Sequence, residues 1–364
     1  MSVKRSHSLS LGIVGLPNSG KSTIFNALTK MSVPAENFPF CTIDKNIGVV
    51  EIPDERLTKM AEHFNAEKIV HSAMTFVDIA GLVKGASKGE GLGNQFLGHI
   101  REVDVVMYVL RAFQSSEIVH VYERVNPVED FEIVQAELIL KDIEVVEKKI
   151  AAVDKLARIG NRDAQEELDI LKRLLEKLNS GIAVVEMELS EGEKKYVYDL
   201  WLLTNKRRMF ILNTKEGMED EQVKEWESQF IGKTGDMVVV ADVKLVGQGE
   251  EEIAEYEKLL GYKPNSVVDI IQRAYECLNL ITFYTGSEKE CNAWTIEKGA
   301  NVKEAAGVIH TDLEDNFITA DVVNLEDMLG VGGWNSAKEK GLVKNHGRDY
   351  LVNDGDYIII LANR

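Results

Sequence analysis

Short apolar runs, each followed by a polar or glycine-rich segment, predict the buried strands of a doubly wound α/β sheet. The runs that carry this prediction lie at 9–14, 74–77, 208–212 and 238–240. Directly after the first run and a short loop, apolar residues from Thr23 onward recur at the spacing of an amphipathic helix. The order strand, loop, helix at the start of the chain therefore predicts the first unit of this sheet.

A different pattern, with apolar residues three and four positions apart, occupies the middle of the chain. It runs from Phe131 to Ala157, stops in the glycine-containing segment 158–163, and resumes over 164–178. Such a heptad stripe is typical of helices that pack against each other, so it predicts two helices folded back as an α-helical coiled-coil hairpin. At 1.5 Å per residue, the stretch 139–157 alone would be about 27 Å long. The hairpin would therefore project beyond a compact α/β domain.

Beyond residue 278 the chain changes again, to short runs that are typical of strands. These runs lie at 280–284, 293–296, 317–322 and 357–361, and one helix is expected at 302–308. They predict a small α+β module. Because the strand at 208–212 follows the hairpin, the hairpin interrupts the α/β domain. The predicted division is a discontinuous α/β domain at 1–130 and 205–278, a helical insertion at 131–204 and a final module at 279–364.

The composition of the chain limits the kinds of molecule that we expect it to bind. The chain has 364 residues, a formal net charge of -18 and three cysteines, Cys41, Cys277 and Cys291. So large a negative charge argues against broad electrostatic adhesion to nucleic acid or to an anionic membrane, and any RNA contact must be local. The cysteine spacings fit neither a zinc site nor a disulfide framework, and the chain has neither an export signal nor a membrane-spanning run. We therefore expect a cytoplasmic protein with no DNA and no membrane partner.

The strongest chemical signal is the segment Gly15 to Ser22, which fills every fixed position of the pattern G-x-x-x-x-G-K-[ST]. It lies between the first predicted strand and helix, where that pattern has its structural meaning. The glycines let backbone amides turn toward phosphates, and Lys21 is expected to reach the outermost ones. The Ser22 hydroxyl is expected to ligate Mg²⁺ at a helix N-terminus that already favours anions. The segment therefore predicts a P-loop, a site for a nucleoside triphosphate.

A second phosphate-sensing motif follows the next predicted strand. Asp78 and Gly81 occupy the fixed positions of D-x-x-G, in which the aspartate holds Mg²⁺ and the glycine amide detects the terminal phosphate. Thr42 is expected to supply a second hydroxyl to the metal. Leu82 stands where well-known GTPases have a glutamine that orients the attacking water. Because an alkyl side chain cannot orient water, we expect slow intrinsic turnover.

Base selection is expected after the strand at 208–212, where guanine-specific proteins carry N-K-x-D. This chain has Asn213, Thr214, Lys215 and Glu216 there instead. A threonine replaces the lysine that covers the base, and a glutamate, one methylene longer, replaces the aspartate that pairs with guanine. Adenine can instead be read by the backbone of Thr214 and the side chain of Asn213. Because an unmet hydrogen-bonding edge costs about 1–3 kcal/mol, the segment favours ATP over GTP.

These motifs together resemble the Obg-like ATPase (YchF) family of translation-factor-class P-loop proteins. The resemblance rests on the segments 15–22, 37–42, 78–97 and 213–216, and it extends over essentially the whole chain. It implies a protein that hydrolyses ATP in preference to GTP, uses Mg²⁺ and associates with the ribosome. It also implies that the final module is a TGS domain, with matching landmarks at 305–310 and 354–356.

The resemblance assigns roles to individual residues. It implies an ATP site made by Thr214 and by a run of P-loop residues, namely Asn18, Ser19, Gly20, Lys21, Ser22 and Thr23. It implies Mg²⁺ ligands at Ser22 and Thr42, and a catalytic histidine, here His120, in the role that the glutamine has vacated. The region 241–244 departs from the family pattern, which leaves the base-side contacts open.

Several alternatives remain open on the sequence alone. His120 lies between two valines, a pattern that is also typical of a half-buried strand residue. Asn18 either binds an activating K⁺ ion or only tolerates a turn conformation. For the whole chain, the alternatives to an ATPase are a GTPase of the Obg class and a nucleotide-stabilised, non-enzymatic adaptor that binds ribosomes or RNA.

The two accessory parts also have alternative roles. The hairpin is either a spacer or a partner-binding arm, and the final module is either structural or in contact with RNA. Despite the net charge, the hairpin has the residues for a local basic surface, which makes partner binding the sharper alternative, and these residues are Lys148, Lys149, Lys155, Arg158, Lys172, Arg173 and Lys177.

Overall fold

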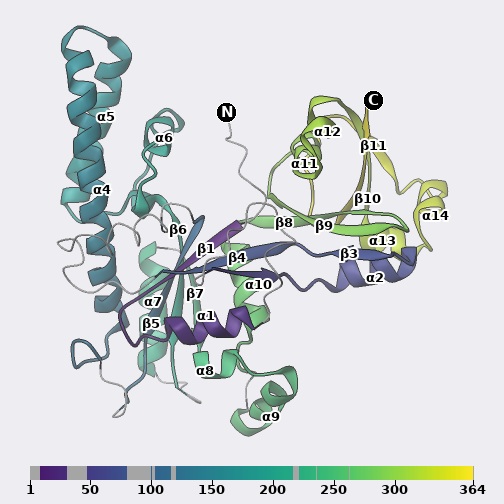
Figure 1. Cartoon of the computed structure of the whole chain (residues 1–364), viewed down its shortest axis with the longest axis horizontal. Coiled ribbons are helices and arrows are strands. Elements are labelled where there is room, and N and C mark those ends of the chain that lie inside the picture. Colours follow the sequence, from purple (N-terminus) through teal and green to yellow (C-terminus); the bar gives the residue numbers. More distant parts are fainter. Residues whose placement is uncertain are drawn as a thin grey trace.

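The computed structural model describes residues 9–30, 47–79, 100, 103–115, 120–215, 221–234, 236–261 and 263–363. These residues form two sheets, each with helices on both faces, and a long helical arm (Figure 1). Within these ranges, no helix combines the length and the apolarity that crossing a bilayer requires.

The first sheet has six strands in the order β2-β4-β1-β5-β6-β7. Their bounds are Leu9–Val14 for β1, Ile47–Glu51 for β2, Ala73–Asp78 for β4, Val105–Arg111 for β5, Arg207–Asn213 for β6 and Met237–Ala241 for β7. All neighbouring pairs are parallel except β2 and β4, which are antiparallel. All four predicted strands of this part are present, and β2 and β5 are additions to them. β1 lies in the interior of the sheet and leads directly into the P-loop.

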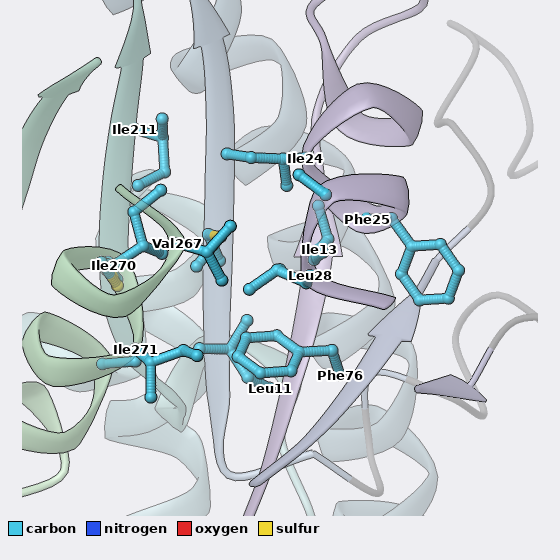
Figure 2. Close-up of a cluster of buried hydrophobic side chains, with 14 of the residues drawn as sticks. Leu11, Ile13, Ile24, Phe25, Leu28, Phe76, Ile211, Val267, Ile270 and Ile271 are labelled. Atoms are coloured by element: carbon cyan, nitrogen blue, oxygen red, sulfur yellow. The ribbon is translucent and has the colours of Figure 1, made fainter. Parts of the chain in front are cut away.

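Helices cover both faces of this sheet, as a doubly wound fold requires. α1 (Lys21–Thr29) and α10 (Val267–Cys277) cover one face, and α4 (Pro127–Arg158) and α7 (Glu221–Thr234) cover the other. Figure 2 shows the first of these cores, where side chains of α1 and α10 meet those of β1, β4 and β6. Two short helices, α8 (Val243–Val246) and α9 (Glu250–Leu260), follow β7. This arrangement confirms the predicted α/β class.

α4 is a single helix of 32 residues that belongs to two parts of the molecule. Asn126 caps its N-terminus and Pro127 occupies its first turn, both of which are favourable at a helix start. Its first turns pack on the sheet through residues such as Phe131, and from Ile139 onward it packs against α5 (Arg162–Asn179). At 1.5 Å per residue, α4 is about 48 Å long. The arm is therefore a direct continuation of a helix that covers the sheet (Figure 1).

The helical hairpin is present as predicted, with two corrections. Its turn occupies only 159–161, because Asn161 caps α5 by accepting a hydrogen bond from the backbone N–H of Ala164 at 3.0 Å. Ala136, which belongs to the predicted stripe that starts at Phe131, is exposed, since α4 still faces the sheet at that point. After α5 the chain returns through the short helices η3 (Val184–Glu186), α6 (Glu191–Tyr198) and η4 (Leu203–Asn205).

The second sheet has the order β11-β10-β12-β8-β9-β3. Its strands from the final module are Leu280–Gly286 for β8, Glu290–Glu297 for β9, Phe317–Asn324 for β10, Lys344–His346 for β11 and Asp356–Ala362 for β12. The helices of the module are Val302–Ile309 for α11, Thr311–Asp315 for α12, Leu325–Gly330 for α13 and Trp334–Glu339 for α14. The four predicted strands and the predicted helix are present, while β11 and the three shorter helices are additions.

One strand of the second sheet comes from the first part of the chain. β3 (Lys68–Val70) pairs in parallel with β9, and α2 (Glu55–Phe64) packs on the same sheet. The Tyr284 hydroxyl donates a hydrogen bond to Asp54, which caps α2. The predicted boundaries assigned this segment to the α/β domain, but its contacts are with the final module. Because the segment joins β2 to β4, it connects the second sheet to the strand that ends in Asp78.

Candidate nucleotide-binding site

The P-loop connects β1 to α1 at the carboxyl end of the parallel strands, where open α/β sheets place their ligands. Neighbouring atoms lie so close to its two glycines that neither position has room for a side chain. A Cβ on Gly15 would lie 2.4 Å from the carbonyl oxygen of Val109. A Cβ on Gly20, whose φ is +109°, would lie 2.5 Å from Nδ2 of Asn213. The loop therefore fits against β5 and β6 only when both positions are glycine.

Lys21 begins α1, and its side chain is held inside the loop. The residue is 8% exposed, and Nζ donates a hydrogen bond to the carbonyl oxygen of Leu16 at 2.9 Å. Burial lowers the pKa of Lys21, and the carboxylate of Asp78 acts in the opposite direction. The ammonium group thus lies within the loop and makes a bond that a phosphate oxygen can replace.

The other P-loop residues differ in exposure. Ser22 and Thr23 are exposed in the first turn of α1, which leaves both side chains accessible to a ligand. Ser19 is buried, and its Oγ has no hydrogen-bond partner within the described ranges. Asn18 has a φ of 63°, a left-handed conformation that asparagine tolerates. This conformation agrees with the turn interpretation of Asn18, and the K⁺ interpretation stays a prediction.

β4 delivers Asp78 to the same edge of the sheet, where it lies beside Ile13 in the register of β1 and β4. Burial raises the pKa of Asp78, and the positive charge of Lys21 lowers it. The atom Oδ1 of Asp78 is buried and makes no hydrogen bond to any described residue. A buried carboxylate oxygen without a partner is unfavourable, and it is also a suitable ligand for a hard cation.

Asn213 ends β6 and connects three parts of the site. Its Nδ2 donates a hydrogen bond to the carbonyl oxygen of Ser19 at 2.8 Å, and its Oδ1 accepts one from the backbone N–H of Val243 at 3.3 Å. The residue is 3% exposed. Both ends of the amide are thus engaged by protein atoms, which joins the P-loop to β6 and to the region 241–244. Direct reading of adenine by this side chain stays a prediction.

Thr214, the next residue, is 7% exposed, and its backbone N–H donates to the carbonyl oxygen of Ala241 at 3.0 Å. That N–H therefore holds β7 beside β6. The buried threonine side chain cannot cover a base in the way that a lysine stem does.

Three of the predicted site residues, Thr42, Gly81 and Glu216, lie outside the described residues, as does Leu82.

His120 is buried and lies outside the strands, so the interpretation as a half-buried strand residue is wrong. Its Nε2 is 2.9 Å from Oδ2 of Asp130, and its Nδ1 accepts a hydrogen bond from the backbone N–H of Tyr122 at 3.2 Å. Because Nδ1 accepts, the proton of the neutral ring is on Nε2 and is donated to Asp130. Burial raises the pKa of Asp130, and the bond from His120 opposes that shift. In this conformation, both ring nitrogens are engaged by the protein.

Arg111 and Asp130 are parts of the site region that the sequence does not reveal. Arg111 ends β5 beside Asn213 and is 2% exposed, and its Nε donates to the carbonyl oxygen of Phe113 at 3.0 Å. Asp130, in the first turn of α4, is 1% exposed. Charged side chains at the end of a strand or the start of a helix are usually exposed to solvent. Their burial follows from the packing of α4 on the sheet, and no sequence motif marks it.

Comparisons with known proteins agree with this fold. A family model described as "50S ribosome-binding GTPase" matches residues 10–153. A model of the YchF-type GTPase C-terminal domain, described as a protein of unknown function, matches residues 280–363.

Relatives and a solved structure match the chain over nearly its full length. The "Ribosome-binding ATPase YchF" of Bacillus subtilis (strain 168) is 44% identical over 363 residues, which cover 96% of this chain and 98% of the relative. The protein of the same name from Escherichia coli O157:H7 is 43% identical, with 97% and 98% covered. The solved structure titled "Structure of the Schizosaccharomyces pombe YchF GTPase" has a TM-score of 0.82 and 34% identity, with 98% of this chain and 99% of that chain covered. With this identity and this coverage of both chains, the protein belongs to the YchF family.

Proposed function

We propose that this chain binds ATP at its P-loop, hydrolyses it slowly, and uses its nucleotide state to control association with the ribosome. The observation that carries the proposal is the placement of the Lys21 ammonium group inside a complete P-loop, where it interacts electrostatically with the carboxylate of Asp78. The relatives are named ribosome-binding ATPases, which supports ATP as the substrate and the ribosome as the partner. A cytoplasmic location is expected of a protein with that partner.

Lys21 is the residue that we expect to balance charge during hydrolysis. When water attacks the γ-phosphate, negative charge develops on the phosphoryl oxygens and on the leaving oxygen. An ammonium group that is already fixed in the loop stabilises this charge with little reorganisation. Backbone N–H groups of the loop, from Asn18 to Thr23 at the start of α1, supply further donors to the phosphates.

The residues around the loop fit a magnesium ion. Mg²⁺ prefers oxygen ligands, and this edge of the sheet offers the exposed Ser22 side chain and the carboxylate of Asp78, whose Oδ1 has no hydrogen-bond partner within the described ranges. Ser22 and Asp78, together with Thr42, would hold the ion directly or through water. When bound, Mg²⁺ neutralises charge on the phosphate oxygens. Gly81 would detect the terminal phosphate.

The group that would orient the attacking water differs from that of well-known GTPases. Leu82 occupies the position that a glutamine has in well-known GTPases, and we assign the vacant role to His120. In the described conformation both ring nitrogens of His120 are engaged, so this histidine must change partners before it can contact water. This requirement supports slow intrinsic turnover. A K⁺ ion beside Asn18 is the second candidate activator.

The preference for ATP is proposed from the residues at the base-binding position. The names of the similar proteins disagree about the nucleotide, since the bacterial relatives are called ATPases and the fission yeast structure is titled a GTPase. In this chain, the buried Thr214 stands in place of the lysine that covers guanine. Glu216 replaces the aspartate that pairs with its edge. A guanine edge left without its partner loses about 1–3 kcal/mol.

The α4–α5 arm offers a surface for ribosomal RNA. Three of the predicted basic residues make ion pairs on or near the arm, in the pairs Lys149–Glu167, Arg158–Asp154 and Arg173–Glu193. The other four have no ion-pair partner within the described ranges, and they are Lys148, Lys155, Lys172 and Lys177. A phosphate backbone is attracted by such unpaired cations. The final module is a second candidate for RNA contact.

Equilibrium titration of the purified chain with ATP and GTP tests the proposal. With Mg²⁺ present, ATP is expected to bind about tenfold more tightly than GTP, which corresponds to about 1.4 kcal/mol. Isothermal titration calorimetry measures both dissociation constants directly. Tighter binding of GTP would instead identify a GTPase of the Obg class, and the absence of binding to either nucleotide would contradict the proposed site.

A further inference from the structure

The hydrogen bond between the buried side chains of His120 and Asp130 affects when His120 can take part in hydrolysis. The side chains of His120 and Asp130 are only 4% and 2% exposed, and the bond between them is 2.9 Å long. The second ring nitrogen of His120 accepts the backbone N–H of Tyr122 at 3.2 Å. A neutral imidazole has one donor and one acceptor. Both are used here, so His120 has no nitrogen left for water or phosphate.

We infer that Asp130 is a latch, a carboxylate that holds His120 in an inactive position and must release it before hydrolysis. The inference rests on the proposed role of His120. A latch differs from the familiar arrangement in which a carboxylate orients a catalytic histidine. In that arrangement one ring nitrogen stays available to the substrate, whereas here the nitrogen that Asp130 leaves free is blocked by Tyr122.

Release requires that Asp130 not be left as an unpaired buried charge, which would be strongly unfavourable. Arg124 is placed to prevent this. Its Nη1 lies 3.8 Å from Oδ1 of Asp130, beyond hydrogen-bond distance, and both atoms are buried and make no hydrogen bond to any described residue. Nη2 of Arg124 pairs with Glu129 at 2.5 Å, which leaves Nη1 to form a hydrogen bond to Asp130 after a small shift. Asp130 thus has its next partner in place while it still holds His120.

Burial raises the pKa of Asp130, and the positive charges that stay in place after His120 leaves act in the opposite direction. The Arg111 guanidinium group interacts electrostatically with Asp130, as do Arg124 and, with the opposite effect, Glu129. Arg111 is itself buried, and its Nη1 makes no hydrogen bond within the described ranges. Two cations and one anion therefore face Asp130 besides His120. Exchange of His120 for Arg124 keeps the local charge balanced.

Removing the latch is expected to raise the rate of ATP hydrolysis. Asp130→Ala should increase kcat about tenfold with little change in KM, because a hydrogen bond to a charged group is worth at least about that factor. Asp130→Asn, which keeps a weaker acceptor, should give a smaller increase and serves if the alanine variant does not fold. Arg124→Gln removes the alternative partner and should lower kcat. Phosphate release from ATP with Mg²⁺ is the measurement.

A matched control is available on the same helix. Asp142 is equally buried and accepts hydrogen bonds from the backbone N–H groups of Leu203 and Thr204, both at 2.8 Å. It makes no hydrogen bond to His120. Asp142→Asn is expected to lower stability and leave kcat unchanged. An equal increase of kcat in Asp142→Asn and Asp130→Asn would overturn the latch, since loosening of α4 would then explain both.

A second readout separates the latch from the catalytic role of His120. Nitrogen-15 NMR of the imidazole, assigned with His120→Gln, should show an Nε2–H protected from exchange in the wild type and unprotected in Asp130→Ala. An unchanged signal in Asp130→Ala would overturn the latch. A kcat lowered in Asp130→Ala as much as in His120→Ala would also overturn it, because Asp130 would then orient the histidine. A released His120 with kcat unchanged in both Asp130→Ala and His120→Ala would likewise overturn the latch, because His120 would then have no role in hydrolysis, while the proposed ATP site at the P-loop would stand.

Discussion

Replacing Lys21 with alanine is expected to lower the rate of ATP hydrolysis by about 100- to 1000-fold, the range found when one preorganised donor to a developing charge is removed. The Lys21 ammonium group is the only cation that the described P-loop holds inside itself, through a 2.9 Å bond to Leu16. A solvent molecule cannot replace a charge fixed at that place. Phosphate release under saturating ATP, with Mg²⁺, measures the effect.

A lysine at the other end of the same helix provides the control. Lys30 follows α1, is exposed, and its Nζ is 3.5 Å from the carbonyl oxygen of Gly247. Lys30→Ala is expected to hydrolyse ATP at the wild-type rate. If Lys21→Ala did so as well, Lys21 would have no role in the reaction and hydrolysis would have to occur elsewhere on the chain.

Replacing Phe210 with alanine is expected to reduce the free energy of unfolding by about 3–5 kcal/mol, as for other fully buried aromatic residues. Phe210 is 0% exposed in the centre of β6. Its ring lies 5.3 Å from that of Tyr108, 5.0 Å from that of Phe131 and 4.7 Å from that of Phe230, between centroids. These partners come from β5, α4 and α7. The substitution would therefore loosen the sheet, the base of the helical arm and α7 together.

Urea unfolding followed by far-ultraviolet circular dichroism measures this loss. Leu259→Ala is the comparison, because Leu259 is 78% exposed on α9 and its truncation should change stability by less than about 0.5 kcal/mol. The packing of α4 on the sheet would be wrong if Phe210→Ala unfolded at the same urea concentration as Leu259→Ala.

The parts of the fold that the sequence predicts are those that local rules determine. The run 9–14 is a strand because it is apolar and ends in a glycine turn, and the loop from Gly15 to Ser22 follows from its fixed positions. The hairpin follows from the heptad spacing of residues such as Val146 and Leu171, which are both fully buried. Each of these predictions needs only residues close together in the chain.

The parts that the sequence does not predict depend on distant residues. β3 has three residues and two of them are exposed, so no apolar pattern marks it, and it is a strand because β9 offers an edge more than 200 positions later. Asn213 resembles a base-reading residue in the sequence, yet its amide is held by Ser19 and Val243. The hydrogen bond from His120 to Asp130 depends on where α4 packs against the sheet.

The most direct test of the whole account is the release of phosphate from ATP by the purified chain with Mg²⁺, alone and with ribosomes. The wild-type chain is expected to release phosphate slowly, and Lys21→Ala is expected to lose that release, under both conditions. ATP that remains bound and intact on the wild-type chain, even with ribosomes present, would contradict it. The chain would then be an adaptor that uses the nucleotide only to hold its shape.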